Sequence, residues 1–133
     1  MMISKEILNK LKKISKEYEL DAFILFGSRA RNTAKKTSDY DLAYFKKNEL
    51  NSKLQISLEN ALFEVFKEKK FDLVIIDEQT PIILKMQILR DGVPIYINNL
   101  KTFEKLKEGT YFDYVDSFSL LEPTKEKFLS QPL

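Results

Sequence analysis

The sequence predicts a single α+β domain in which one mixed β-sheet carries packed helices. Short apolar runs bounded by glycine, proline or polar residues indicate strands, and longer stretches with apolar residues every three or four positions indicate amphipathic helices. These patterns follow one another in the order helix, strand, strand, helix, strand, helix, strand, helix, which favours a layered mixed fold. A chain of 133 residues can bury one core of this kind.

The first half of the chain begins with an amphipathic helix. Ser4 is a suitable N-cap for it, and the helical spacing ends near Glu19. Residues 22–26 form an apolar run closed by a glycine, which indicates a buried strand and a tight turn. Residues 40–45 indicate the second strand, and residues 48–52 a loop. The apolar face of the next helix comprises Leu54, Leu58, Ala61, Leu62, Val65 and Phe66.

The third strand is expected over residues 71–76, and a helix follows it. Thr80 is a candidate N-cap for this helix, with Pro81 in the first helical position. Gly92 supplies the signal that ends the helix.

The last part of the chain is expected to hold a strand over 93–97, a helix over 100–118 and an extended arm. Pro94 lacks an amide donor, which places its strand at a sheet edge or makes it a strand start. Residues 121–133 contain two prolines and no clear period, so the domain is predicted over 1–120 and a C-terminal arm over 121–133. One apolar stripe on the last helix consists of Tyr111, Tyr114, Val115 and Phe118. This stripe either packs back on its own sheet or contacts another chain, a second copy or a partner protein.

The composition excludes several kinds of chemistry. The chain has no cysteine and no histidine, so thiolate, imidazole and cysteine- or histidine-based zinc chemistry are excluded. A net charge of +2 gives no signal of nucleic-acid binding. No apolar run is long enough to cross a membrane, and the lysine-rich start does not resemble a signal peptide. A cytoplasmic location is therefore expected.

Two aspartates open the second predicted strand. Asp39 and Asp41 alternate along it, so their carboxylates share one face while Tyr40 faces away. Two such charges repel one another unless a cation lies between them, and Mg²⁺ prefers oxygen ligands completed by substrate phosphates. The alternative is a solvated pair at a strand start.

A possible phosphate-binding turn precedes these aspartates. Gly27 leaves the first strand and lets backbone amides approach an anion closely, while the Ser28 hydroxyl can hold phosphate oxygens. Arg29 and Arg31 could neutralise a polyphosphate. Taken singly, the Gly-Ser pair is a common turn and each arginine could simply be solvated.

The combination of these residues is more specific than its parts. Gly27-Ser28, a spacer of ten residues and Asp39-Tyr40-Asp41 resemble the signature of the DNA polymerase β-like nucleotidyltransferase superfamily. The segments 27–31 and 38–42 are closer still to the minimal nucleotidyltransferases, the MntA-like antitoxins paired with HEPN-domain toxins. Asn32 stands where these proteins commonly have glycine, but asparagine tolerates a left-handed backbone.

This resemblance implies a function and a site. It implies a nucleotidyltransferase fold that transfers AMP from ATP to a tyrosine hydroxyl of a HEPN-type toxin. It also implies that carboxylates hold Mg²⁺, as two ions. The third carboxylate implied by the fold would be Asp72, which matches a hydrophobic-Asp-hydrophobic pattern and could also act as general base. Asp77 is the other candidate, although it is better interpreted as part of the loop leaving the strand.

Two other functions remain open at this level. The chain could neutralise a partner by occlusion without catalysis, or it could transfer a nucleotide to a small-molecule hydroxyl. Incubation with Mg²⁺ and labelled ATP, with and without the partner, would separate catalysis from occlusion. Enzymes that act on small molecules usually add an acceptor-binding domain, for which this chain has no residues left.

Overall fold

The computed structural model describes residues 1–120 of the chain. The predicted arm over 121–133 lies outside the described residues, as does the side chain of Phe118 from the predicted apolar stripe.

The centre of the molecule is one mixed four-stranded sheet in the order β3-β2-β1-β4. The strands are β1 (Ala22–Phe26), β2 (Tyr40–Phe45), β3 (Phe71–Ile75) and β4 (Val93–Ile97). Strand β1 pairs antiparallel with β2 and with β4, whereas β2 and β3 are parallel. The predicted mixed sheet is confirmed, and so is the edge position of the strand that contains Pro94.

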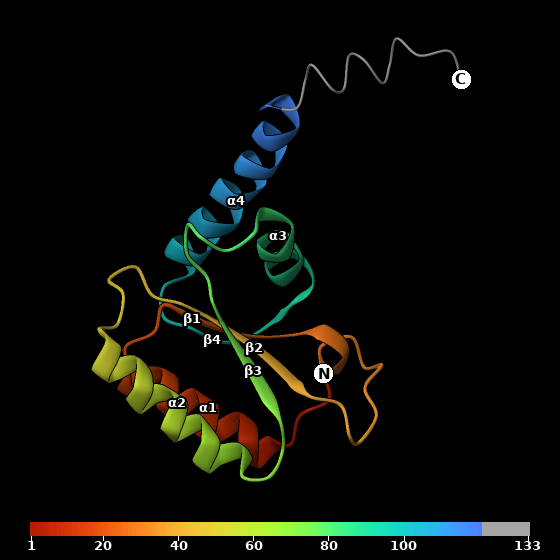
Figure 1. Ribbon diagram of the computed structural model, residues 1–133, viewed down its shortest axis with the longest axis vertical. Coiled ribbons are helices and arrows are strands. Elements are labelled where there is room, and N and C mark those ends of the chain that lie inside the picture. Colours follow the sequence, from red (N-terminus) through yellow and green to blue (C-terminus); the bar gives the residue numbers. More distant parts are fainter. Residues whose placement is uncertain (121–133) are drawn as a thin grey trace.

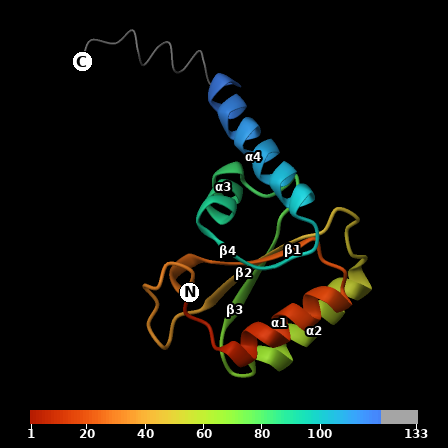
Figure 2. The same ribbon diagram turned by 180° about the vertical axis from the view of Figure 1, so that it is seen from behind.

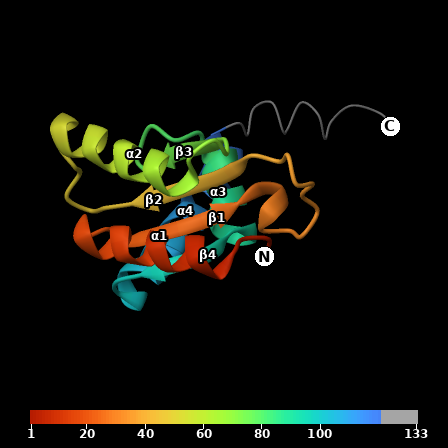
Figure 3. The same ribbon diagram turned by 90° about the horizontal axis from the view of Figure 1, so that it is seen from below.

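Helices cover both faces of this sheet. The elements are α1 (Lys5–Glu17), α2 (Ser52–Phe66), α3 (Ile82–Asp91), α4 (Leu100–Leu120) and the short 3₁₀ helix η1 (Gly27–Arg29). Helices α1 and α2 run side by side on one face, while α3 and the start of α4 lie on the other (Figures 1 and 2). Seen from below, α1 and α2 lie in front of the sheet (Figure 3). The predicted α+β fold class is confirmed, with the sheet lying between two layers of helices (Figure 1).

Each face of the sheet has its own core because strand residues alternate between faces. On the α1/α2 face, Leu11, Leu58 and Leu62 are fully buried against alternate strand residues such as Leu25 and Leu42. The core of the α3/α4 face comprises Ala22, Ile24, Ala43, Ile76, Ile88, Leu89 and Phe103. The two cores fix which side chains of each strand point to which helices.

Helix caps mostly follow the sequence. The Ser4 hydroxyl oxygen accepts a hydrogen bond from the Ile7 amide at 3.2 Å, which confirms the cap of α1. The expected cap of α3 is wrong by one residue, because Pro81 is the N-cap. The Thr80 hydroxyl is engaged elsewhere, since it donates to the Ile75 carbonyl at 2.8 Å and closes the turn after β3.

Gly92 ends α3 as predicted, but the reason is space and not a left-handed backbone. Its φ is −70°. A Cβ added here would lie 2.3 Å from the Ile88 carbonyl oxygen and 2.5 Å from Cγ2 of Ile24. Glycine therefore allows the end of α3 to pack closely against β1.

Helix α4 extends beyond the sheet (Figure 1). Tyr111, Phe112 and Val115 are 54%, 55% and 41% exposed, so the idea that the whole apolar stripe packs on its own sheet is wrong for Tyr111 and Val115. Among the described residues, no helix is long and apolar enough to cross a membrane.

Candidate active site

The residues of the sequence motif meet at one end of the sheet. Strand β1 ends where β2 and β3 begin, and the register pairs Phe26 with Asp41 and Asp41 with Asp72. Neighbouring strands lie about 4.8 Å apart, so Asp41 and Asp72 are adjacent in the sheet although they are distant in sequence. The turn at Gly27 follows Phe26 directly.

The two paired aspartates lie on the α3/α4 face of the sheet. Their neighbours Tyr40 and Leu42 belong to the core of the α1/α2 face, and strand residues alternate. Tyr40 is only 4% exposed, which confirms that it faces away from the aspartates. Asp39 is exposed and immediately precedes β2, whereas Asp41 is half-buried and Asp72 is exposed.

The carboxylates act on one another electrostatically. Burial raises the pKa of Asp41 above its usual value, and the negative charges of Asp72 and Asp39 raise it further. The positive charge of Arg31 lowers this pKa and so opposes the shift. A cation bound beside these carboxylates would reduce their repulsion and favour the ionised form of Asp41.

Gly27 lies directly beneath the Asp41 carboxylate. Its φ is +74°, a left-handed conformation that favours glycine. A Cβ at this position would lie 2.1 Å from Oδ2 of Asp41. Asn32 also has a positive φ of 59°, as predicted for a residue that replaces glycine in the turn.

Ser28 is held in place through its backbone. Its carbonyl oxygen accepts hydrogen bonds from the Thr33 amide at 3.0 Å and from the Thr33 hydroxyl at 3.3 Å. Its own hydroxyl has no hydrogen-bond partner among residues 1–120. This hydroxyl is therefore available to a ligand.

The three aspartates have the chemistry of a magnesium site without forming a closed cage. No group of three acidic side chains within residues 1–120 is close enough to hold a metal ion. The donors nevertheless fit the ion, because they are oxygen ligands on neighbouring strands and their charges already disfavour one another. Substrate phosphates usually supply part of the ligand set of Mg²⁺.

The two arginines of the motif differ sharply. Arg31 is exposed, and its positive charge lowers the pKa of Asp41. Arg29 is 8% exposed, and its guanidinium donates to the backbone carbonyls of Met2, Lys36 and Ser38. The expected role of Arg29 in phosphate binding is therefore corrected, because its donors already have protein partners.

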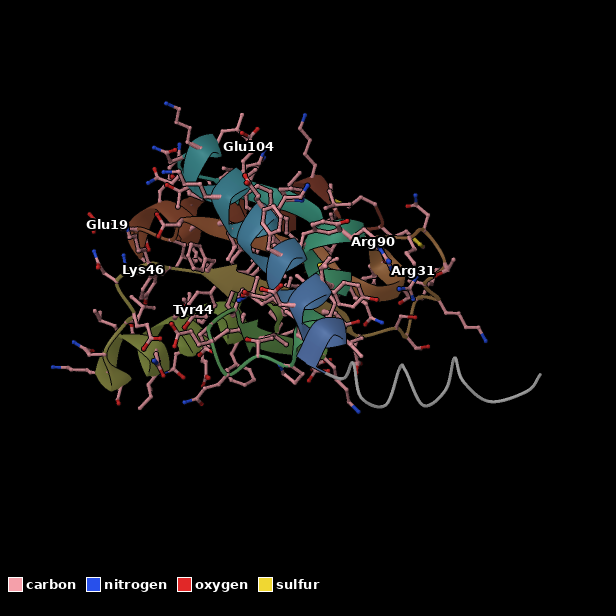
Figure 4. The ribbon with its side chains drawn as sticks, turned by 90° about the horizontal axis from the view of Figure 1, so that it is seen from above. Glu19, Arg31, Tyr44, Lys46, Arg90 and Glu104 are labelled. Atoms are coloured by element: carbon pink, nitrogen blue, oxygen red, sulfur yellow. The ribbon has the colours of Figure 1, made fainter. Side chains whose placement is uncertain are left out.

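A pocket of about 300 Å³ adjoins the motif. It lies between the turn after β1 and the last turns of α3, and its lining residues are Phe26, Gly27, Arg31, Leu84, Gln87, Arg90 and Asp91. Arg90 donates to both carboxylate oxygens of Asp91 at 2.9 Å. Arg31 and Arg90 lie at the same end of the molecule, opposite Glu19 and Lys46 (Figure 4).

The α3 residues of this pocket were missed by sequence reasoning. One signal could have placed them. Gly92 leads directly from α3 into β4, and β4 runs antiparallel to β1, so the end of α3 must lie near the end of β1. A larger hollow of about 440 Å³ lies at the opposite end of β2 and β3 and contains none of the motif residues.

Asp77 lies at the far end of β3 from Asp72. Its Oδ1 accepts hydrogen bonds from the amides of Gln79 at 2.8 Å and Thr80 at 3.2 Å. It therefore stabilises the loop that leaves the strand, and Asp72 alone of the two lies beside Asp41.

A comparison with protein families identifies the class of protein. Residues 9–101 match the model of the family described as polymerase beta, nucleotidyltransferase, so this chain belongs to that nucleotidyltransferase family. No curated protein matches the chain in sequence.

Solved structures of toxin–antitoxin complexes share the fold. One, a toxin–antitoxin with AMP-PNP, is 20% identical with a TM-score of 0.73 over 92% of this chain and 98% of that chain. A second, MntA–HepT, is 18% identical with a TM-score of 0.69 over 96% and 100% of the two chains. A third contains a tri-AMPylated HEPN toxin of Shewanella oneidensis with its MNT antitoxin, at 18% identity and a TM-score of 0.68 over 93% and 97%.

Proposed function

We propose that this chain is an antitoxin that transfers AMP from ATP to a hydroxyl, a tyrosine hydroxyl in particular, of a HEPN-type toxin in the cytoplasm. The observation that carries the proposal is the meeting of Gly27, Asp41 and Asp72 at one end of the sheet. The similar structures that contain AMP-PNP or an AMPylated toxin support this choice of nucleotide and acceptor.

The chain's own residues have distinct roles in this reaction. The Ser28 hydroxyl and the amides of the turn bind phosphate oxygens, and Arg31 offsets their charge from the pocket beside α3. Asp72 is exposed and can accept the proton of the incoming hydroxyl. The hydroxyl oxygen forms a bond to the α-phosphorus while the bond to pyrophosphate breaks, so pyrophosphate leaves with its electron pair.

Asp39, Asp41 and Asp72 are the residues that would hold Mg²⁺, one ion or two. When bound, the metal would shield the phosphate charge and lower the pKa of the attacking hydroxyl. The position of the Asp41 carboxylate depends on Gly27, because the absence of a side chain at Gly27 leaves room for it.

The acceptor can reach the site from the side of β3. This strand is an edge of the sheet, and Asp72 is exposed on it. A site that is open on this side can admit a side chain of another protein, whereas a small acceptor would find little to enclose it. The exposed apolar residues Tyr111 and Phe112 on α4 offer additional surface for such a partner.

The test is an assay of label transfer. The chain is incubated with Mg²⁺ and ATP labelled in the α-phosphate, with and without the toxin, and label on the toxin is measured. The Asp41→Asn variant should transfer nothing, while Asp77→Asn is the matched control because Asp77 lies at the far end of β3. Loss of label in Asp41→Asn together with loss of neutralisation in cells supports the proposal.

Neutralisation by occlusion is the competing outcome, and the exposed residues of α4 favour a binding surface in either case. If Asp41→Asn still neutralises the toxin fully and no label is transferred by the wild-type chain, binding alone accounts for the function.

A further inference from the structure

Arg29 is a buried cation without an acidic partner. It is 8% exposed, and none of the ion pairs among residues 1–120 involves it. Its guanidinium carbon lies 3.8 Å from the centre of the Tyr40 ring, in a cation–π contact. A charge in such a place needs several hydrogen bonds to offset its lost hydration.

These hydrogen bonds all go to backbone carbonyls of segments that flank the site. Nε and Nη2 of Arg29 both donate to the Ser38 carbonyl, at 3.2 and 3.0 Å. Nη2 also donates to the Lys36 carbonyl at 3.3 Å, and Nη1 to the Met2 carbonyl at 3.0 Å. The Met2 amide in turn donates to the Arg29 carbonyl at 2.7 Å.

Ser38 immediately precedes Asp39, so its carbonyl belongs to the peptide that carries the Asp39 amide. Tyr40, on which the guanidinium stacks, immediately follows Asp39. Arg29 therefore holds both chain neighbours of Asp39 from the face of the sheet opposite to Asp41.

From this arrangement we infer that Arg29 is a positioning residue, which closes the spacer between the two halves of the motif and sets the place of Asp39 beside Asp41. This inference rests on the proposed nucleotidyl transfer. Arg29 does not contact the nucleotide in this role. It acts through the backbone of Ser38 and through the ring of Tyr40.

The chemistry of the side chain explains why lysine could not replace it. The planar guanidinium directs its donors in fixed directions and stacks on an aromatic ring, whereas an ammonium group is a single strongly hydrated charge. Three carbonyls, one at Met2 and two in the spacer at Lys36 and Ser38, need such a fork. Arg29→Lys should therefore keep the charge and lose the geometry.

The test compares Arg29→Lys with Arg31→Lys. For Arg29→Lys we expect kcat of transfer to fall about 10²-fold, since small misplacements of a reacting group have effects of that size, with KM for ATP changed little. Arg31 is exposed in the pocket, so Arg31→Lys should mainly raise KM for ATP. Loss of folded protein alone would also lower the apparent kcat without changing KM, so kcat is expressed per folded chain, measured by circular dichroism.

A second readout does not depend on activity. Hydrogen exchange of the amides in residues 33–40 should be faster in Arg29→Lys than in the wild type, while exchange in α2 is unchanged. If Arg29→Lys fails to fold, Tyr40→Leu removes the ring beneath the guanidinium, and Tyr40→Phe, which keeps the ring, is its control. Tyr40→Leu should then show the same loss of kcat and the same faster exchange.

The outcomes separate the two proposals. An unchanged kcat in Arg29→Lys, or a higher KM for ATP with kcat unchanged, overturns the positioning role. If the wild-type chain transfers no nucleotide, the proposed function fails by itself. In that case faster exchange over 33–40 still supports the placement of Asp39 by Arg29, and unchanged exchange contradicts it.

Discussion

Replacing Gly27 with alanine puts a methyl group where the Asp41 carboxylate lies. The added Cβ would be 2.1 Å from Oδ2 and 3.0 Å from Cγ of Asp41, so the carboxylate has to rotate away. The backbone at φ +74° adds a penalty of its own, because an alanine in the left-handed region costs about 1–2 kcal/mol. A displaced Asp41 side chain costs about 0.5–1.5 kcal/mol more.

These contributions predict a loss of about 1.5–3.5 kcal/mol in the free energy of unfolding for Gly27→Ala. Transfer activity of the folded chain should fall about 10²-fold or more, because the displaced group is the one that must face the phosphates. Urea unfolding gives the first quantity, and label transfer well below the melting temperature gives the second.

Two controls separate the site from the fold. Gly109 lies in α4, where an added Cβ has no neighbour within 4 Å, so Gly109→Ala should gain up to about 1 kcal/mol and keep full activity. Leu11 is fully buried in α1 away from the site, and Leu11→Ala should lose about 2–5 kcal/mol while the folded fraction stays active. Full activity in Gly27→Ala would refute the reasoning about Asp41.

Three further predictions concern the charged and polar residues of the site. Asp39→Asn and Asp41→Asn should each lower transfer at least about 10²-fold without unfolding the chain, measured by label transfer and circular dichroism. The pKa of Asp41 in the folded state is raised above 3.8, its ordinary value in an unfolded chain. The ionised carboxylate therefore destabilises the fold fully above the raised pKa, and this destabilisation disappears as the pH falls to 3.8 and below. In the presence of a chelator, Asp41→Asn should therefore be more stable than the wild type at pH 7, and the difference should shrink as the pH approaches 4; an unchanged difference in urea titrations would contradict this. Ser28→Ala and Arg31→Ala should weaken ATP binding in calorimetric titrations more than they lower the melting temperature, and unchanged binding in both would mean that the phosphates bind elsewhere.

Most of the fold could be predicted because local patterns and the global fold agree. Pro94 indicated an edge strand since it cannot donate to a neighbour, and β4 is an edge. The cap of α3 was misplaced by one residue because the sequence cannot show that the Thr80 hydroxyl is used by the turn after β3. The residue type favours a cap at Thr80, but its hydroxyl donates to the Ile75 carbonyl instead.

The parts of the site that depend on residue spacing along a strand could be predicted from the sequence. The burial of a side chain and the lining of the pocket could not. Alternation along β2 puts Tyr40 and Asp41 on opposite faces, and the register of a parallel pair brings Asp72 beside Asp41, whereas Asp39 immediately precedes the strand. Arg29 and Arg31 look equivalent in sequence. In the structure, only Arg29 is buried, and its guanidinium donates to backbone carbonyls. The pocket residues Gln87 and Arg90 come from α3, whose place depends on the path of the whole chain.

The pairing of Asp41 with Asp72 also makes activity a gauge of correct refolding. The two residues belong to parallel strands that α2 connects, and their alignment depends on a single register. A slip of β3 by one residue would turn Asp72 to the opposite face and bring Phe71 or Leu73 into its place, while the sheet itself could still form. Circular dichroism would count such molecules as folded. Specific activity after refolding from urea would count only the molecules whose strands are aligned, so the ratio of the two signals measures the fraction of chains in the native register.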